Sequence, residues 1–575
     1  MSFQPLLKPL KPYRAYCIIG PLFKLAEAVL ELYLPLLMAQ VIDHGVASGD
    51  TAYIRRMGLI MLGIVATGLG CAIVCQYMAS VTSQGYGTEL RRKVFGHILS
   101  FSHAELDRLG TSSLINRVTG DVNQLQYAVA MLIRLVIRAP FLCIGGAIMA
   151  LLIDWRLALI VLALIPLFVL VITAVMRKTV PLHRAVQKRL DRLTLVLREN
   201  LSGIRVIRAF SRTVPEQKRF AEATEEHTDA SIRVGRISTL LNPLTQLLMN
   251  CGILAIVWFG GVRIQAGSDL TTGEIVALIN YINQILLALT VVANLVVTFS
   301  KAYASAGRIT ELLEVTSSVR EAENAAEMPV DGAPAVQFSH VSFSYGGEDT
   351  LTDIDFSVPV GSTVGIIGGT GSGKTTLVSL LMRFYDVTEG AVYLHGQDIR
   401  TLPAEALRRE IGLVPQRVEL FSGTIADNLR LGAPQATEND LRRAAKIAQA
   451  AEFIDQKPEK YDTVAERGGT NFSGGQRQRL AIARALVSSP RILVLDDASS
   501  ALDYATDAAL RREIAALKGV TVFLISQRVS SIRHTDRILV LDDGCLAGQG
   551  THEELLRSCA LYREICASQE KEASV

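Results

Sequence analysis

Six long apolar stretches dominate the first half of the chain. Each is close to the ~20 residues that cross a bilayer as a helix, and they cover residues 16–42, 57–82, 130–153, 157–176, 243–264 and 275–299. A short proline-rich segment, residues 1–15, precedes the first of them. The pattern predicts a transmembrane domain of six helices over 16–300, with residues 1–15 as an interfacial segment at the membrane surface.

From residue 336 onward the pattern changes. Short β-rich runs such as 362–367 and 491–495 alternate with amphipathic helical segments. This alternation is typical of an α/β domain, which we expect over 336–575. The stretch 301–335 combines an acidic cluster with Pro329 and Pro334, so it predicts a linker between the two domains.

Lysine and arginine are concentrated in two segments between the apolar stretches. Residues 177–236 are the richest, and the segment after the second stretch carries Arg91, Arg92 and Lys93. By the positive-inside rule both segments face the cytoplasm, which places both termini and the 336–575 domain there. The expected location is the cell membrane, which in a bacterium is the inner membrane. Both segments are long enough to extend spans two to five as helices beyond the bilayer.

Composition excludes several classes of protein. Half of the 575 residues are apolar and only 20% are charged, against about 25% in a typical soluble protein, so the chain is neither disordered nor fibrous. The 58 basic and 55 acidic residues give a net charge of +3, which offers no basic excess for nucleic acid. Eight cysteines show no metal-ligand spacing, so we expect reduced thiols that pack against neighbours.

A glycine-rich run follows the predicted strand that ends at Ile367. It matches G-x-x-x-x-G-K-[ST] and consists of Gly368, Gly369, Thr370, Gly371, Ser372, Gly373, Lys374 and Thr375, with Thr376 opening the next helix. Glycines let such a loop curl until its N–H groups point at phosphate oxygens. Lys374 then reaches the β- and γ-phosphates and the Thr375 hydroxyl coordinates Mg²⁺, so the run predicts ATP binding.

Two further motifs support a nucleotide site. Residues 492–497 form a buried-strand pattern that ends in Asp496 and Asp497, where Asp496 would hold Mg²⁺ directly or through water. Between this run and the glycine-rich loop, a turn opens a helix whose N–H groups can hold an anion; its residues are Ser473, Gly474, Gly475 and Gln476.

Taken together, these motifs give the chain a resemblance to a half-transporter of the ATP-binding cassette (ABC) exporter family. The signature L-S-G-G-Q occurs as residues 472–476, with Phe472 in place of leucine. Other family elements align in order: Tyr345 resembles the adenine-stacking aromatic, Gln416 the Q-loop glutamine, 466–468 the X-loop, Ser500 to Asp503 the D-loop, and Arg117, Asp121 and 199–210 the intracellular coupling regions. In this family Gln416 contributes to catalysis and to the metal site, and Asp503 to the nucleotide interface.

The resemblance implies a dimer. In this family two cassettes meet head to tail, and each ATP lies between the P-loop of one chain and the signature of the other. ATP binding favours the closed pair, and hydrolysis reopens it. The membrane domains then alternate between inward-facing and outward-facing states.

Two positions depart from the family pattern. The glutamate that polarises the attacking water is Asp497 here, and the switch histidine is Gln527. Shortening the side chain by one methylene withdraws the carboxylate by about 1.5 Å, and a displacement of about 1 Å can cost roughly a hundredfold in rate. Gln527 can donate to a γ-phosphate but has no titratable proton. Such changes are typical of the degenerate-site subunit of bacterial heterodimeric multidrug-type exporters.

Three hypotheses about function remain open. The favoured one is an exporter subunit that binds ATP at a weakly hydrolytic site and supplies its signature to a consensus partner. The alternatives are an active homodimeric exporter, and a regulatory ATP-binding subunit with all turnover in the partner. The substrate class expected from the family is amphipathic: a small compound, a lipid or a peptide.

Charged residues inside the spans are costly and are candidates for function. Lys24, Glu27 and Glu31 share one face of the first span, and Arg134 and Arg138 lie in the third. Lys24 and Glu27 are expected to pair. For Glu31 two interpretations stand side by side: a structural partner, or a cavity residue that attracts cations.

Overall fold

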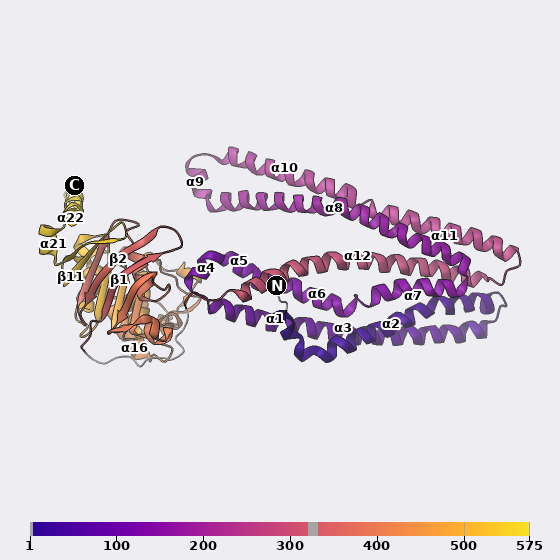
Figure 1. Ribbon diagram of the computed structural model, residues 1–575, viewed down its shortest axis with the longest axis horizontal. Helices are drawn as coiled ribbons and strands as arrows, with labels where there is room; N and C mark the ends of the chain where they lie inside the picture. The colour runs from indigo at the N-terminus through magenta and orange to yellow at the C-terminus, as the bar shows by residue number, and fades with distance from the viewer. Residues whose placement is uncertain (1–3, 320–331, 499–500, 574–575) are drawn as a thin grey trace. The chain divides into compact units, whose positions relative to one another are not determined.

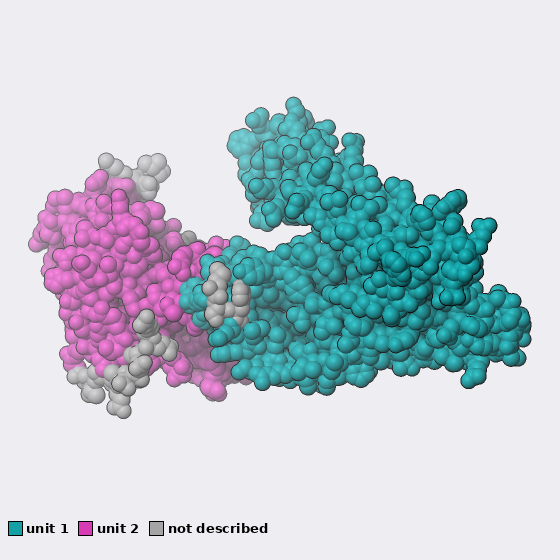
Figure 2. Space-filling model, turned by 45° about the vertical axis from the view of Figure 1, so that its right-hand side comes forward, with its two compact units in different colours: residues 1–99, 112–315 teal, residues 100–111, 316–575 magenta. Residues whose placement is uncertain are grey.

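The computed structural model describes residues 4–319, 332–498 and 501–573. The chain divides into two compact units, residues 1–99 with 112–315 and residues 100–111 with 316–575 (Figure 2). The short segment 100–111 therefore belongs to the same unit as the C-terminal domain. Each unit has its own packed core and is described separately.

The first unit is entirely helical in its described residues. Six of its helical segments are long and apolar enough to cross a membrane, which confirms the expected six-span domain. The helices are α1 (Gln4–Leu7), α2 (Arg14–Gln40), α3 (Thr51–Leu99), α5 (Thr111–Asn116), α6 (Val122–Arg134), α7 (Arg138–Ile153), α8 (Trp155–Ser202), α9 (Ile204–Ala209), α10 (Thr213–Ser238), α11 (Leu241–Gln265) and α12 (Thr272–Glu314).

Small residues allow the helices of the first unit to approach closely. Gly146 on α7 leaves room for Ile285 of α12, because a Cβ added to this glycine would lie 3.0 Å from the Ile285 side chain. Tyr281 on α12 is fully buried and donates its hydroxyl to the Leu32 carbonyl of α2 at 2.7 Å. In a bilayer, burial of apolar surface does not drive helices together, so close packing and interhelical hydrogen bonds stabilise their association.

Four charged residues of the first and third spans are paired with one another. Lys24 binds Glu27 at 2.6 Å, as expected, and Arg138 on α7 binds Glu31 on α2 at 2.7 Å. Arg138 also lies 3.9 Å from Glu27. Glu31 is therefore held as a structural partner, and the structure gives no support to its alternative interpretation as a cation-attracting residue.

The loop residues that resembled a coupling region hold the membrane unit together. Asp121 is buried and accepts the Nε of Arg308 on α12 at 2.9 Å. Arg117 donates to the Arg308 carbonyl at 3.1 Å and lies 3.7 Å from Glu311. Both residues therefore brace α12 against the start of α6.

Helices α8 and α10 run side by side and are joined by the short helix α9 (Figure 1). Exposed ion pairs link them, with Arg192 binding Glu226 at 2.8 Å and Arg219 binding Glu199 at 2.8 Å. The tip of this hairpin is apolar and exposed: Phe210 exposes 74% of its surface. Helices thus extend spans four and five well beyond their apolar stretches, as the sequence predicts.

Helix α12 continues to Glu314, past residue 301 where the sequence suggested the start of the linker. Ala302, Ala306, Ile309 and Leu312 are all buried and recur at helical spacing, so burial of this face extends the helix. Pro329, which belongs to the predicted linker, lies within 320–331, outside the described residues.

The second unit contains three sheets. Its strands are β1 (Val336–Ser344), β2 (Asp349–Val358), β3 (Thr363–Gly368), β4 (Glu389–Leu394), β5 (Gln397–Asp398), β6 (Ile411–Val414), β7 (Gly423–Thr424), β8 (Val464–Ala465), β9 (Ile492–Asp496), β10 (Thr521–Ile525), β11 (Arg537–Asp542) and β12 (Cys545–Gly550). The six-stranded sheet has the order β12-β11-β3-β10-β9-β6, and all its pairs except β11–β12 are parallel. The α/β fold expected from the sequence is confirmed.

Helices complete the second unit. They are α4 (His103–Leu109), α13 (Lys374–Leu381), α14 (Ala404–Glu410), α15 (Ile425–Arg430), α16 (Glu438–Ile447), α17 (Ala451–Asp455), α18 (Gly474–Val487), α19 (Tyr504–Ala515), α20 (Val529–Ile532), α21 (His552–Ser558) and α22 (Ala560–Ala573). In the parallel register Ile525 of β10 lies opposite Ile366 of β3 and Asp496 of β9. The loops after β3, β6, β9 and β10 therefore meet at one edge of the sheet.

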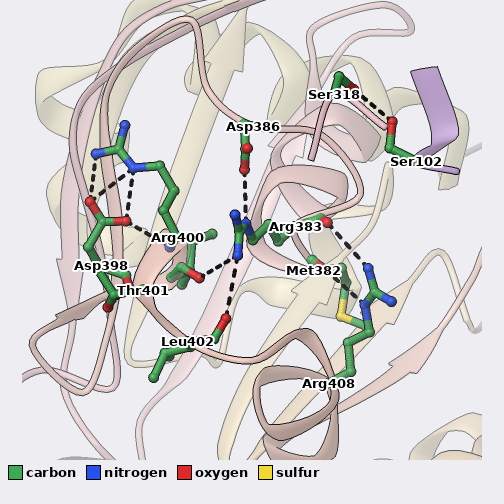
Figure 3. Close-up of polar contacts among 11 residues, drawn as sticks. Ser102, Ser318, Met382, Arg383, Asp386, Asp398, Arg400, Thr401, Leu402 and Arg408 are labelled. Atoms are coloured by element: carbon green, nitrogen blue, oxygen red, sulfur yellow. Dashed lines mark hydrogen bonds and ion pairs between the residues drawn. The ribbon is translucent and has the colours of Figure 1, made fainter. Parts of the chain in front are cut away.

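Helix α4 docks on the loop that follows α13. His103 stacks on Phe384 with ring centroids 4.2 Å apart, and Tyr385 donates its hydroxyl to Asp107 at 2.6 Å. The buried Arg383 fixes this loop by donating its Nε to Asp386 at 2.9 Å and its Nη1 to the Leu402 carbonyl at 3.4 Å (Figure 3). The aromatic pair is thus presented to α4 by a loop anchored in the core.

A second contact ties α4 to the chain that enters the second unit. Ser102, at the N-cap of α4, lies 2.8 Å from the Ser318 hydroxyl, a contact also visible in Figure 3. Glu105 accepts the Ser318 N–H at 3.2 Å, and this hydrogen bond, with those from Ser102, lowers the pKa of Glu105 although burial acts in the opposite direction. Segment 100–111 and the start of 316–575 are therefore held together by side chains of α4.

Candidate nucleotide site

The glycine-rich loop lies between β3 and α13, as its motif requires. Gly371 and Gly373 have φ values of +86° and +93°, a left-handed conformation that L side chains rarely adopt. A Cβ on Gly368 would collide with the Leu541 carbonyl oxygen. Glycine is thus required here by the curl of the loop itself, and the N–H groups of the α13 start remain available to an anion.

The Lys374 side chain folds over the loop. Its ammonium donates to the carbonyls of Gly368 and Gly369 at 2.9 and 2.5 Å and to the Ser372 hydroxyl at 3.2 Å. Burial lowers the pKa of Lys374, and the carboxylates of Asp496 and Asp497 oppose that shift. A phosphate would give this ammonium anionic oxygen acceptors in place of the neutral carbonyl oxygens.

A cavity of about 100 Å³ gathers the loops at the edge of the parallel sheet. Its lining brings the catalytic candidates together with the glycine-rich loop: Thr370, Gly371, Lys374, Thr375, Gln416, Asp496, Asp497, Ile525, Ser526 and Gln527. Gln416 follows β6, Asp496 ends β9 and Gln527 follows β10. Residues separated by more than a hundred positions thus face one space because their parallel strands end together.

The two carboxylates of this cavity lie in surroundings that disfavour their ionised form. Burial raises the pKa of Asp496 above its ordinary value, and the neighbouring Asp497 adds to that shift. Burial also raises the pKa of Asp497, while Arg528 and Lys374 oppose it. Thr375 donates to Asp496 at 3.4 Å, so a hydroxyl and a carboxylate oxygen lie together as Mg²⁺ ligands would. The donor set fits a magnesium-bound phosphate.

Asp497 has a constrained backbone. Its φ is +50°, unusual for a residue other than glycine, and its N–H donates to the Ile525 carbonyl at 3.0 Å. Its carboxylate lines the cavity together with Lys374.

Tyr345 lies after β1, on a platform of aromatic rings. It packs edge-on against Phe343 and Tyr385, with centroids 4.8 and 5.2 Å away, and its hydroxyl donates to Thr376 at 3.2 Å. More than half of the side chain, 55%, stays exposed. A ring that is fixed at its edges and open on a face is suited to stacking on a base.

Replacing Tyr345 by alanine should weaken ATP binding by about 5- to 150-fold, since base–aromatic stacking contributes roughly 1–3 kcal/mol. Phenylalanine keeps the ring and loses only the hydrogen bond to Thr376, so Tyr345→Phe should bind ATP within about threefold of the native chain. Equilibrium binding of labelled ATP to the purified variants measures both effects. Equal affinity for Tyr345→Ala and the native chain would remove Tyr345 from the site.

The signature residues form the start of α18. Ser473 accepts the Gln476 N–H at 3.3 Å, and Gln476 returns a bond by accepting the Ser473 N–H at 3.1 Å. A Cβ on Gly475 would lie 2.9 Å from the Ala501 carbonyl, so glycine allows α18 and the loop before α19 to touch. Phe472, at the position where the family has leucine, is buried in the adjacent core.

The signature and the glycine-rich loop do not share a cavity within this chain. Among the described residues that line the 100 Å³ cavity, none comes from 472–476, and Asp503 serves instead as the N-cap of α19, accepting the Thr506 N–H at 2.9 Å. Ser500 falls within 499–500, outside the described residues. The arrangement leaves two separate half-sites on one chain.

Comparison with known proteins agrees with this architecture. Residues 17–289 match the family described as ABC transporter transmembrane region, and residues 351–500 match the family described as ABC transporter. The chain belongs to the ABC transporter family. The first matched region covers most of the helical unit and includes segment 100–111, and the second lies in the unit that contains the glycine-rich loop.

Several relatives are similar to this ABC transporter over nearly its whole length. An uncharacterized ABC transporter ATP-binding protein of Mycobacterium tuberculosis is 40% identical, covering 98% of each chain. An ATP-dependent lipid A-core flippase of Chromohalobacter salexigens is 34% identical, covering 99% of this chain and 98% of the relative. A solved structure of a bacterial Atm1-family ABC exporter with ATP bound superposes with a TM-score of 0.81 at 26% identity, over 97% of this chain and 99% of that one.

These likenesses identify an exporter-type ABC transporter with an ATP-binding domain. Sequence motifs located the glycine-rich loop, Gln416, Asp496, Asp497 and Gln527, and the structure places all of them in one cavity. The motifs missed α4, whose His103 and Asp107 hold Phe384 and Tyr385, because these contacts join segments far apart in the chain. The only signal for α4 in the sequence is the capping pair Ser102 and Glu105.

Proposed function

We propose that this chain is one subunit of an ATP-driven exporter, with a binding site that hydrolyses ATP slowly and a signature that completes the partner's site. The observation that carries the proposal is the cavity lining. Lys374, Thr375 and Asp496, which hold phosphate and Mg²⁺, are intact, whereas the two positions that act on the attacking water are Asp497 and Gln527. The groups expected to bind ATP are therefore retained, whereas the groups expected to promote its hydrolysis are altered.

The separation of the half-sites supports a dimer. In the exporter family each ATP is enclosed by the glycine-rich loop of one chain and the signature of the other, which fits a chain whose own halves do not meet. Mg²⁺, when bound by Thr375, Asp496 and Gln416, would neutralise charge that develops between the β- and γ-phosphates. Lys374 holds the phosphates, and the signature offers helix N–H groups to the partner's nucleotide.

The purified chain alone should retain ATP and turn it over slowly. Labelled ATP bound in the presence of Mg²⁺ should be recovered largely unhydrolysed after gel filtration, and turnover should stay at least about tenfold below the typical enzyme rate of about 10 per second. Co-purification with the protein encoded beside it would identify a partner. A fast ATPase formed by this chain alone would establish the active homodimer instead.

The nucleotide domain and the membrane spans act in one transport cycle. We place the nucleotide domain and both termini in the cytoplasm of a bacterial cell, because lysine and arginine are concentrated in the segments that carry α9 and α4. Closure of two such domains around ATP would then change access to the membrane path from one side to the other.

A groove in the membrane unit favours an anionic amphiphile as the substrate. It has a volume of about 610 Å³, lies between α2, α3 and α6, and combines the basic Arg134 with the exposed apolar Ile73 and Tyr77, while Lys24, which also lines it, is paired with Glu27. A cation beside an apolar wall suits a negatively charged headgroup with a hydrocarbon tail. The relatives named lipid A-core flippases support a lipid among the amphipathic candidates.

Phosphatidylglycerol should raise the Tm of the purified chain more than phosphatidylcholine does, because only the first carries a net negative headgroup. Arg134→Gln should remove that difference. Arg156→Gln, which changes an exposed arginine next to Trp155, should preserve it. A thermal shift that is the same for both lipids in the native chain would reject the anionic substrate class.

A further inference from the structure

The C-terminal helix α22 reaches the loop that carries Gln527. Gln569 on this helix donates its side-chain N–H to the Gln527 carbonyl at 2.6 Å and accepts the Val529 N–H at 2.8 Å. One side-chain amide thus bridges two backbone groups on either side of Arg528. The bridged loop connects β10 to α20 and borders the nucleotide cavity.

The bridge satisfies a helix end that has no local cap. Helix α20 begins at Val529, and its N-cap residue, Arg528, provides no side-chain hydrogen bond. The first N–H groups of a helix need an acceptor from outside the helix, and an arginine side chain carries only donors. Gln569 supplies the missing acceptor from a helix that is distant in sequence.

Helix α22 is itself fixed. Tyr562 is fully buried and lies 2.8 Å from His552 through its hydroxyl, and Cys566 is buried in the same core cluster. Tyr562, Cys566 and Gln569 recur at spacings of four and three residues, so they share one face of the helix. Gln569 therefore projects from a support whose position is set by the core.

The far side of the loop is held as well. Arg511 on α19 donates to the Ser530 and Ser531 carbonyls at 3.1 and 2.8 Å, and to the Ser531 hydroxyl at 2.8 Å. Arg511, which also pairs with Asp507 on its own helix, holds residues of α20, whereas Gln569 binds the Gln527 carbonyl and the Val529 N–H on either side of Arg528. Ser526 braces the same loop by accepting the Arg528 N–H at 3.0 Å, and the side chain that binds the Gln527 carbonyl itself is Gln569.

We infer that Gln569 is a positioning residue of the nucleotide site, which sets the backbone of Gln527 so that its side chain meets the γ-phosphate. The inference rests on the proposed role of Gln527. It predicts a contact that ATP makes and ADP does not, because only ATP has the third phosphate. Loss of Gln569 should then reduce the preference for ATP over ADP without changing how the rest of the nucleotide binds.

The test compares the affinities of ATP and ADP in the purified full-length chain. Gln569→Ala should lower ATP affinity by about tenfold, as expected for a lost hydrogen bond to a charged group, and leave ADP affinity within about twofold. Ser568→Ala, on the exposed side of the same helix, is the matched control and should change neither. In the double variant with Gln527→Ala, Gln569→Ala should add nothing further, since both act through one contact.

Amide hydrogen exchange gives a readout that does not require nucleotide. Exchange of the Val529 N–H should accelerate about tenfold or more in Gln569→Ala, because its acceptor is gone. Gln569→Glu keeps an acceptor for Val529 but cannot donate to Gln527, so it should protect this amide and still lose ATP preference. This variant also separates the bridge from any general loss of stability.

The outcomes decide between the two proposals. An unchanged Val529 exchange rate and an unchanged ATP-to-ADP ratio in Gln569→Ala would overturn the positioning role. A native chain that binds neither nucleotide would instead refute the proposed ATP site, and the exchange of Val529 would still decide whether the bridge exists. Tm values identify any variant that fails to fold. If Gln569→Ala does not fold, Gln569→Glu takes its place in the test.

Discussion

Restoring both altered residues should convert the purified chain into a faster ATPase. In Asp497→Glu with Gln527→His, the carboxylate advances by about 1.5 Å and the switch position gains a titratable proton. Since a misplacement of about 1 Å can cost roughly a hundredfold in rate, we expect turnover to rise about a hundredfold. Asp497 lines the cavity and its N–H is bound to the Ile525 carbonyl, so the longer side chain would extend from a backbone that β10 holds in place.

Steady-state ATPase of the native chain, the two single variants and the double variant measures this gain. Adding Lys374→Ala to the double variant should abolish the activity, which shows that the gain comes from this cavity and not from a contaminating ATPase. A native chain that is already fast, and that the double substitution changes by less than about twofold, would contradict the weakly hydrolytic site.

The second large effect concerns the signature. With a co-purified partner of consensus sequence, Ser473→Ala should reduce turnover by roughly a hundredfold, as does the removal of a single hydrogen-bond donor that stabilises a transition state. Asp497→Asn in the same complex should reduce it by less than about twofold, because the proposed site hydrolyses little ATP. Replacing the partner's catalytic glutamate by glutamine should eliminate nearly all turnover.

A capping control separates catalysis from folding. Ser473 also caps α18, and losing a cap costs about 1 kcal/mol of stability. Thr437 caps α16 in the same way, with a capping box of its own, but lies outside the signature. Thr437→Ala should therefore lower Tm as much as Ser473→Ala and leave turnover nearly unchanged. Gly475→Glu is a weaker test, because a side chain there would also strike the Ala501 carbonyl.

Local motifs predicted most of the site, since its chemistry lies in short runs. Residues 368–375 and 492–497 each combine a strand with the groups that follow it, and the parallel register brings their ends together. The apolar stretches likewise predicted the six spans, because bilayer thickness fixes their length. The end of α12 at Glu314 was not predicted, because burial of its face depends on tertiary contacts.

Contacts between distant segments could not be predicted from one sequence. Nothing near Glu31 indicates that Arg138 is its partner, and nothing near Gln569 indicates a role at the Gln527 loop. Tyr385 is similar: its bond to Asp107 requires α4 to meet the loop after α13. In each case the sequence pattern around a residue reflects only its neighbours in the chain, whereas the contact depends on how distant elements pack in the fold.

The exposed tip of the α8–α10 hairpin has a consequence for the life of the protein in the cell. Phe210 and Val214 each expose 74% of their surface, and Val206 exposes 60%. Soluble surfaces rarely present apolar side chains in such a cluster without a protein to cover them. A chain that has not yet assembled would display this tip to chaperones and quality-control proteases, so assembly that covers the tip would protect the chain from degradation.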